Sequence, residues 1–251
     1  MPMRFRFLIV ALLAVTACAK APPPTPTPAA RLEQARRLTR RGQWLKALPV
    51  LQALVFELSG GRPELPEVSY LTGEAFFQTG SYQDAAEQFR KTSENFPESP
   101  YAPLALLRAG DASMRQWRRP QLDPTNGEAA LAAYQELAGR YPESEAAARA
   151  SLHVRRLRTW LAEKAYSNGM FYLRRRAYDS AILYFREVVA VYGDTQWVPP
   201  ALLRLIDSYH AISYNEERKE TCAHLRRFFP QTAVDGTKCP AAAPADTGAS
   251  P

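Results

Sequence analysis

Apolar residues in the middle of the chain recur at the three- and four-residue spacing of amphipathic helices, and one pair of residues returns several times. In this pair an alanine is followed four residues later by a large apolar residue, so both side chains lie on one face of a helix. The pairs are Ala47 with Leu51, Ala85 with Phe89, Ala130 with Tyr134, and Ala181 with Phe185. No segment alternates Val, Ile and Thr with polar residues as a strand does. The pattern therefore predicts an all-α fold.

Glycine and proline mark where the predicted helices end. The motif Gly-x-aromatic-x-x-Ala occurs at 42–47, at 80–85 and, with Arg in place of Gly, at 176–181. We expect the glycine to end the first helix of a unit, because glycine adopts positive φ without penalty. Aromatic-Pro pairs close three units, at 96–97, 141–142 and 229–230. Proline ends the second helix because it cannot continue the backbone hydrogen bonds.

This arrangement resembles the tetratricopeptide repeat, a helix–turn–helix unit of about 34 residues. The resemblance implies a solenoid of about five helix–turn–helix units, which is about ten helices. Two intervals between units are longer than this repeat. We expect a Pro-bearing loop at 117–127 inside the third unit. Residues 145–161 are expected to form one long helix, or two helices end to end, that joins the third unit to the fourth.

The first residues are organised as an export signal. Two arginines precede an apolar stretch at 7–15, which is too short to span a bilayer. Cys18 then follows small residues, as in the lipobox of bacterial lipoproteins, so we predict a signal peptide over 1–17 and a lipid on Cys18. An ordinary signal peptide with a chance cysteine is the alternative. Ala19 is not Asp, which by the same resemblance favours the periplasmic side of the outer membrane.

The remaining boundaries follow from local composition. Residues 18–30 hold the lipidated cysteine and a Pro-rich run, which predicts a semi-rigid tether. Residues 233–251 are rich in Ala and Pro, and we expect a disordered tail there. Between them we expect the N-terminal repeats, units one to three, at 31–144 and the C-terminal repeats, units four and five, at 145–232.

Composition narrows the classes of function. Hydrophobic residues make up 46% and charged residues 23% of the chain, which excludes a wholly disordered chain and a multi-span membrane protein. The formal net charge of +7 suits an acidic partner or an anionic membrane surface, and the export signal disfavours nucleic acid. Arginines cluster at 36–41, 115–119, 155–158 and 174–176. Most of these clusters are expected near helix C-termini, where the helix dipole favours cations; the alternative is contact with an acidic partner.

No motif for catalysis or for a cofactor occurs. His153, His210 and His224 are scattered without carboxylates at ligand spacing, so we predict no metal site and no cofactor besides the covalent lipid. A hydrolase on a helical scaffold would need a clustered acid–base pair, which the sequence does not offer, so we predict that the protein is not an enzyme. In an oxidising compartment Cys222 and Cys239 suggest a disulfide. A buried Cys222 thiol beside a free tail thiol is the alternative.

The first helix of each repeat lines the concave side of such a solenoid. In units two and three it places aromatic, apolar and polar side chains there, a combination that suits an extended peptide. The candidate residues of the peptide-binding groove are Glu67, Tyr70, Glu74, Phe77, Gln78, Leu107, Asp111, Met114 and Arg115. The alternative is that these side chains pack against neighbouring repeats.

Longer motifs resemble the BamD family of outer-membrane β-barrel assembly lipoproteins. These motifs lie at 120–125, 140–144, 157–164 and 171–178. The resemblance implies five repeats without catalysis, whose N-terminal units receive segments of unfolded outer-membrane proteins. It also implies that the C-terminal units dock on a BamA-like barrel insertase. Candidates for this docking, by position, are Arg174, Arg175, Arg176 and Tyr184.

Two points qualify this resemblance. Arg176 stands where the family typically has Gly, so the turn needs a left-handed residue other than Gly or a different cap. A competing hypothesis is another periplasmic repeat lipoprotein, one that coordinates envelope or division complexes in the manner of the Tol–Pal coordinator CpoB. That class carries an N-terminal coiled coil. No heptad segment precedes the repeats here, which favours the assembly adaptor.

Overall fold

The computed structural model describes residues 26–58 and 61–239. Within these ranges all regular secondary structure is helical and no strand occurs, which confirms the predicted class. The ten helices are α1 (Pro28–Arg40), α2 (Trp44–Glu57), α3 (Leu65–Gln78), α4 (Tyr82–Asn95), α5 (Tyr101–Gln116), α6 (Thr125–Arg140), α7 (Glu145–Arg174), α8 (Tyr178–Val191), α9 (Val198–Ala211) and α10 (Asn215–Phe228). Among them, none has both the length and the apolar character needed to cross a membrane.

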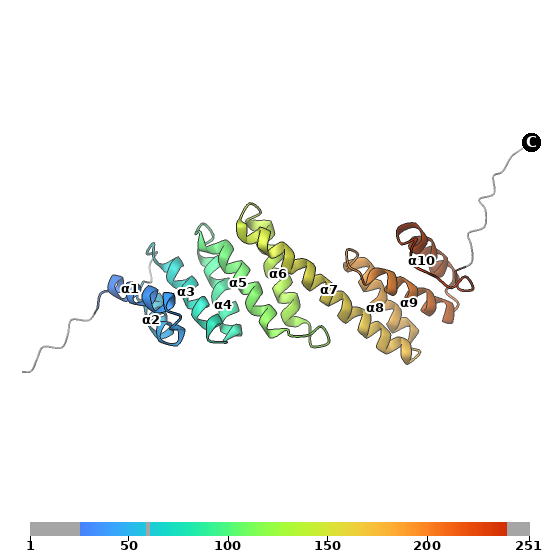
Figure 1. Cartoon of the computed structure of the whole chain (residues 1–251), viewed down its shortest axis with the longest axis horizontal. Helices are drawn as coiled ribbons and strands as arrows, with labels where there is room; N and C mark the ends of the chain where they lie inside the picture. Colours follow the sequence, from blue (N-terminus) through green and yellow to red (C-terminus); the bar gives the residue numbers. More distant parts are fainter. Residues whose placement is uncertain (1–25, 59–60, 240–251) are drawn as a thin grey trace, which may run out of the picture.

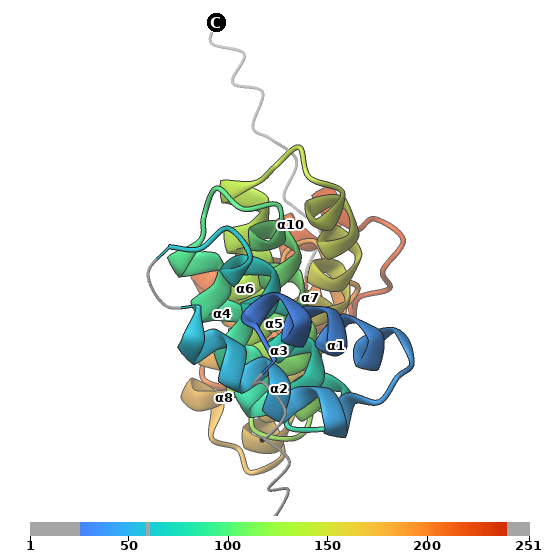
Figure 2. The same ribbon diagram turned by 90° about the vertical axis from the view of Figure 1, so that its left-hand side faces the viewer.

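Consecutive helices pack against one another in chain order, as expected of a solenoid. The main contacts join each helix to the next, from α1 with α2 to α9 with α10. Figure 1 shows the helices stacked side by side along the long axis of the molecule. In the end view of Figure 2, α1 and α2 lie in front of the other helices. The helices form five helix–turn–helix units, and the odd-numbered helix is the first of each unit.

Four of the five units use the same tight turn between their helices. The turn residue has positive φ, with 68° at Gly42, 86° at Gly80, 59° at Arg176 and 62° at Ser213. In each turn the backbone N–H of the positive-φ residue and the N–H of the residue after it both donate hydrogen bonds. Their acceptors are carbonyls in the last turn of the first helix. Arg176 therefore keeps the left-handed geometry without glycine, at a steric cost of about 1–2 kcal/mol.

Three of the second helices end at an aromatic residue before proline, as the sequence predicts. Phe96, Tyr141 and Phe229 share φ of −133° or −134° and ψ of 55° or 57°. The proline that follows disfavours the α conformation at these positions. Tyr141 also donates its hydroxyl hydrogen to the carbonyl of Pro97 at 2.8 Å, which ties the end of α6 to the end of α4.

Each unit is filled by one side chain of its second helix, which we call the plug. In units two to four the plug is aromatic and fully buried, and a glycine of the first helix lies against its ring. These pairs are Gly73 with Phe89, Gly110 with Tyr134, and Gly169 with Phe185. The first unit has Ala35 and Leu51 at the corresponding positions, and the fifth has Ile206 and Cys222. In each unit a large residue on one helix is thus matched by a smaller residue on the other helix. This pairing keeps the interior of the unit close-packed.

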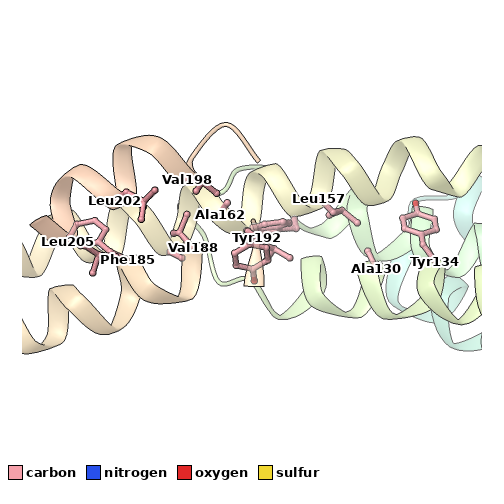
Figure 3. Close-up of a cluster of buried hydrophobic side chains, with 14 of the residues drawn as sticks. Ala130, Tyr134, Leu157, Ala162, Phe185, Val188, Tyr192, Val198, Leu202 and Leu205 are labelled. Carbon is pink, nitrogen blue, oxygen red and sulfur yellow. The ribbon is translucent and has the colours of Figure 1, made fainter. Parts of the chain in front are cut away.

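The third and fourth units are joined by α7, a single helix of 30 residues. It contacts both α6 and α8, and Figure 1 shows it crossing from one to the other. Ser144 caps its start by accepting the N–H of Ala147 at 3.1 Å. The buried residues of these units form one continuous cluster, which Figure 3 follows from Tyr134 and Leu157 to Phe185 and Leu205. Of the two alternatives for this segment, the structure has the single long helix.

Several predicted boundaries differ from the structure. Helix α1 begins at Pro28, so the last residues of the predicted 18–30 tether are helical. Thr27 causes this early start, because its Oγ1 accepts the N–H of Ala30 at 3.2 Å and proline suits the first helical position. Helix α6 begins at Thr125, inside the predicted 117–127 loop. The signal peptide, Cys18 and the last twelve residues lie outside the described residues.

The structure also corrects the start of the predicted tail and places one arginine cluster away from a helix end. Residues 233–239 were expected in a disordered tail, but the structure describes them and buries Cys239 at their end. Three of the four arginine clusters, at 36–41, 115–119 and 174–176, lie at the C-terminal ends of α1, α5 and α7, as expected for most of them. The arginines at 155, 156 and 158 are the exception and lie inside α7. The dipole argument therefore does not explain their presence, and their contacts have to be considered individually.

Candidate functional site

A hollow of about 580 Å³ opens between units two, three and four, and we call it the central pocket. The side chains that line it come from α3, the start of α4, α5, the loop after α5, and α7. They are Phe77, Tyr82, Arg108, Asp111, Met114, Arg115, Trp117, Arg118, His153, Arg156 and Trp160. This lining combines four arginines with four large aromatic residues and a single carboxylate.

Arg108 is held in place by neighbouring helices. Its guanidinium donates to both carboxylate oxygens of Glu74, at 2.5 Å and 2.9 Å, and to Asp111 at 3.1 Å. It also lies 3.9 Å from the ring centroid of Phe77. Burial opposes the positive charge, but the hydrogen bonds and charges of the two carboxylates outweigh it and raise the pKa of Arg108. Arg108 is therefore a fixed cation whose charge is balanced inside the fold.

Asp111 is engaged from a second side. The hydroxyl of Tyr134 donates to its Oδ1 at 2.7 Å. Burial, and after it the charge of Asp111, raises the pKa of the Tyr134 phenol, which keeps the phenol protonated as a donor. His153 of α7 stacks on the same tyrosine ring at 5.3 Å. The only carboxylate in the pocket lining is thus bound by Arg108 and Tyr134 and leaves the other arginines of the pocket uncompensated.

Arg115, Arg118 and Arg156 form no ion pair within the described part of the chain. Arg156 lies 5.0 Å from the ring centroid of Trp160, which itself packs edge-to-face on Trp117 at 5.6 Å. The indole N–H of Trp117 is buried and has no acceptor among the described residues. Free guanidinium groups beside aromatic faces can bind carboxylate and carbonyl oxygens while apolar side chains of a ligand pack on the rings.

The structure brings together only part of the predicted groove. Phe77, Asp111, Met114 and Arg115 line the central pocket. Leu107 does not, because it is 1% exposed and belongs to the core that α6 and α7 complete over α5. Its place in the groove was therefore a wrong prediction.

The remaining predicted groove residues lie on α3, outside the central pocket lining. Glu67 is paired with Arg36 of α1 at 2.6 Å, and Glu74 with Arg108. Tyr70 donates to Glu74 at 3.2 Å and packs between the rings of Phe89 and Tyr101. Gln78 is exposed at the end of the helix. For the first three, packing against neighbouring repeats describes what the side chains do in this structure.

Seven of the eleven residues that line the pocket were not among the predicted groove residues. Tyr82 and Trp160 fell within the predicted helical repeats, Trp117 within the predicted loop, and His153 among the scattered histidines. Arg118 and Arg156 were noted only as members of arginine clusters, and Arg108 was not singled out. The two clusters at 115–119 and 155–158 were the available signal. They converge because α7 crosses α5, and this crossing follows from tertiary packing rather than from a local motif.

The predicted docking residues lie together at the turn between α7 and α8. Arg174, Arg175 and Arg176 are exposed, and Arg175 lies 3.5 Å from the ring centroid of Phe171. Phe171 packs edge-to-face on Tyr172, which stacks on Tyr184 at 5.5 Å. Arg175 and the rings of Phe171, Tyr172 and Tyr184 thus form a continuous cationic and aromatic surface, which we call the α7–α8 surface.

The structure joins Cys222 and Cys239 by a disulfide, with Cα atoms 5.8 Å apart. This is the first of the two alternatives open from the sequence. The segment after α10 is held back on the fold by two more contacts. Lys238 pairs with Asp207 of α9 at 2.6 Å, and Arg226 donates to the carbonyl of Cys239. The predicted end of the solenoid is therefore extended by a cross-linked C-terminal segment.

Among the described residues, no group of His, Cys, Asp and Glu side chains is arranged to hold a metal ion. The three histidines occupy separate places. His153 stacks on Tyr134, His210 contacts Arg218 through Nδ1 at 2.6 Å, and His224 packs on Phe228. The lining of the central pocket offers charged and aromatic side chains for recognition.

Comparison with known proteins places the chain in a family. The family model YfiO, described as outer membrane lipoprotein, matches residues 33–225, which is more than half of the chain. The chain is 31% identical over 160 residues to the outer membrane protein assembly factor BamD of Caulobacter vibrioides, covering 64% of this chain and 52% of that protein. It is 31% identical over 103 residues to the protein of the same name from Vibrio cholerae, covering 41% and 43%.

The chain thus spans about half the length of the curated relatives it matches. Solved structures with a similar fold include the tetratricopeptide-repeat domain of P58(IPK), at a TM-score of 0.45 and 13% identity, covering 81% of this chain and 51% of that one. The TPR2AB domain of yeast Sti1 in complex with a pHSP90 chain has a TM-score of 0.40 at 12% identity, covering 81% and 78%. From the family match, the chain belongs to the YfiO family of outer membrane lipoproteins.

Proposed function

We propose that this protein is a non-catalytic adaptor in the assembly of outer-membrane proteins. In this proposal the chain is anchored through a lipid on Cys18 at the periplasmic side of the outer membrane. Its central pocket receives an extended segment of an unfolded outer-membrane protein, and its α7–α8 surface docks on a barrel insertase. Membership of the family and the names of its relatives support the assembly role.

The observation that carries the client-binding role is the composition of the central pocket. Three uncompensated arginines surround aromatic faces, and the nearest carboxylate is already bound. A peptide segment that offers a carboxylate and apolar or aromatic side chains matches both features. The pocket opens between first helices, the side on which a solenoid of this kind presents a concave surface for peptides.

The docking role is supported by the α7–α8 surface. Exposed arginines and stacked aromatic residues are enriched at protein interfaces, where they supply much of the binding energy. This surface lies at the C-terminal end of α7 and on α8, whereas the pocket residues of α7, His153, Arg156 and Trp160, lie earlier in the same helix. One chain can therefore engage a client and an insertase at the same time.

Charge reversal in the central pocket tests the client-binding role. We expect Arg115→Glu combined with Arg156→Glu to weaken binding of a labelled peptide from the C-terminal strand of an outer-membrane barrel by roughly 10- to 100-fold. A lost charged hydrogen bond is worth about 1.5–3 kcal/mol, and each 1.4 kcal/mol is tenfold in affinity. Fluorescence anisotropy measures the dissociation constant.

Arg119→Glu is the matched control, because Arg119 is exposed in the same region but does not line the pocket. It changes the net charge of the region without touching the lining, so its dissociation constant should stay close to that of the parent chain. Equal weakening by the control and by the pocket variant would reduce the effect to general electrostatics. Unchanged binding by the pocket variant would place the client elsewhere.

A further inference from the structure

The outward face of α2 is apolar although nothing in the described part of the chain covers it. Leu45 is 79% exposed and Phe56 is 84% exposed. Pro49 and Gln52 are also exposed, and the four residues fall on one side of the helix, opposite the buried Ala47, Leu51 and Leu54. From Leu45 to Phe56 this stripe runs for about 16 Å along the helix, at about 1.5 Å per residue.

The second unit shows what a solvated face looks like in this fold. Helix α4 occupies in unit two the position that α2 occupies in unit one. At the four positions corresponding to the stripe it carries Gln83, Glu87, Arg90 and Glu94, all exposed. The apolar stripe is therefore a property of α2 and not of the repeat. Two large apolar residues more than three quarters exposed on one helix face indicate a surface that is covered in the assembled state.

Cations gather at one end of this stripe. Arg37, Arg40, Arg41 and Lys46, at the end of α1 and the start of α2, are exposed and form no ion pair within the described residues. The nearby carboxylates are already engaged, since Glu33 and Glu67 pair with Arg36. An exposed apolar helix face beside uncompensated cations is the arrangement of helices that lie in the interface of an anionic membrane.

The start of the fold lies at the other end of the stripe. Arg31 of α1 pairs with Glu57 at 2.5 Å, which places the beginning of α1 beside the end of α2, next to Phe56. Pro28 is ten positions after Cys18 in the chain. A chain of that length reaches at most about 33–36 Å, so a lipid on Cys18 keeps α2 close to the bilayer surface.

We propose that the outward face of α2 lies on the membrane to which the chain is anchored. Leu45, Pro49 and Phe56 enter the interface between headgroups and acyl chains, and the cations at the α1–α2 turn meet the phosphates of anionic phospholipids. The first unit is thereby held against the bilayer in one orientation, with the later units extending away from it. This inference rests on the lipid anchor of the proposed function.

Spin labels at matched positions test the orientation. The full chain, lipidated at Cys18, is reconstituted in vesicles of phosphatidylethanolamine and phosphatidylglycerol and carries a nitroxide at Gln52→Cys or, as control, at Arg90→Cys. The two positions correspond on α2 and α4. The other cysteines do not react, because Cys222 and Cys239 are bonded and Cys18 is acylated. Power saturation compares the access of apolar oxygen and of a polar nickel chelate to each label.

We expect the label at position 52 to shift toward oxygen access and the label at position 90 to remain in water. Adding Phe56→Glu should abolish the shift at position 52 while the chain still floats with the vesicles. Because Phe56 is exposed, this substitution leaves the fold intact, which an unchanged circular dichroism melting curve confirms.

Other outcomes overturn the proposal in distinguishable ways. If the chain floats with vesicles and both labels remain in water, α2 does not lie on lipid although the anchor stands. If the chain does not float, the anchor itself fails and the proposal falls with it. If position 52 is in water on vesicles but is shielded from both reagents in isolated outer membranes, a protein partner covers α2 instead of lipid.

Discussion

Replacing Phe185 by alanine should lower the free energy of unfolding by about 3–5 kcal/mol, the usual cost of removing a fully buried phenylalanine. Phe185 is the plug of the fourth unit. It is 0% exposed, and its ring packs on Tyr166 at 5.5 Å and against Gly169 of α7. The alanine variant leaves a cavity that the helices on either side cannot close without moving. Urea denaturation followed by circular dichroism measures the change.

The glycine opposite the plug provides a sharper test of the same contact. A Cβ added at Gly169 would lie 2.6 Å from the ring of Phe185. We therefore expect Gly169→Ala alone to cost about 1–3 kcal/mol through overpacking. In the presence of Phe185→Ala the new methyl group has space, so the double variant should lose less than the sum of the two single losses.

Leu183→Ala on the same helix is the control, because Leu183 is 68% exposed and its change should stay within about 0.5 kcal/mol. Additive losses in the double variant would contradict direct packing of the plug on the glycine. The same result would also remove the explanation for the recurrence of glycine opposite an aromatic plug in three units.

The second large effect concerns the C-terminal disulfide. Cys239→Ser should destabilise the last unit by about 3 kcal/mol, because the bond between Cys222 and Cys239 closes a loop with a sequence separation of 17. Repeat proteins contact mainly their neighbours, so the loss should be concentrated in α9 and α10. Hydrogen exchange of the α10 amides, measured with and without a reductant, localises the change.

Treating both the parent chain and Cys239→Ser with reductant provides the control for this experiment. It should reproduce the loss in the parent chain and have no further effect on Cys239→Ser. Peptide binding to the central pocket should be the same in both, since the pocket is built from α3, α4, α5 and α7. Protection of α10 that does not depend on reductant would show that Lys238 and Arg226 hold the segment without the disulfide.

The helix ends that could be predicted from the sequence are those that the residues at the boundary themselves determine. Gly42 and Gly80 end first helices because the turn requires positive φ, and Phe96 and Tyr141 end second helices because proline follows. The start of α7 at Ser144 follows from its cap. The left-handed turn at Arg176 was one of two alternatives, because the surrounding pattern required such a turn while the residue itself disfavours it.

The central pocket could be predicted only in part, because its two sides meet through long-range packing. The spacing of Asp111, Met114 and Arg115 on one helix was sufficient to place them together. Arg156 and Trp160 reach the same pocket because α7 crosses α5, which no local pattern reports. Leu107 shows the reverse error. Its helical spacing allowed a place in the groove, but the same crossing covers it with the core.

The three proposed functions belong to different parts of the solenoid. The α2 face lies at the N-terminal end of the solenoid, which the proposed anchor would tether. The central pocket lies at units two to four, and the α7–α8 surface lies beyond it. A client bound in the central pocket would thus lie between the membrane-bound unit and the docked insertase. In the proposed arrangement the chain would act as a scaffold between the client and the insertase.

Crosslinking in the envelope tests the adaptor role most directly. A photoreactive residue in place of Arg175 probes the α7–α8 surface in the full, membrane-anchored chain, and mass spectrometry identifies the protein captured from outer membranes. The account predicts capture of the barrel insertase, with loss of the crosslink when the photoreactive residue is moved to exposed Arg90 on α4. Capture of Tol–Pal or peptidoglycan-associated proteins at position 175, with no insertase, would contradict the assembly role and favour an envelope-coordinating repeat lipoprotein.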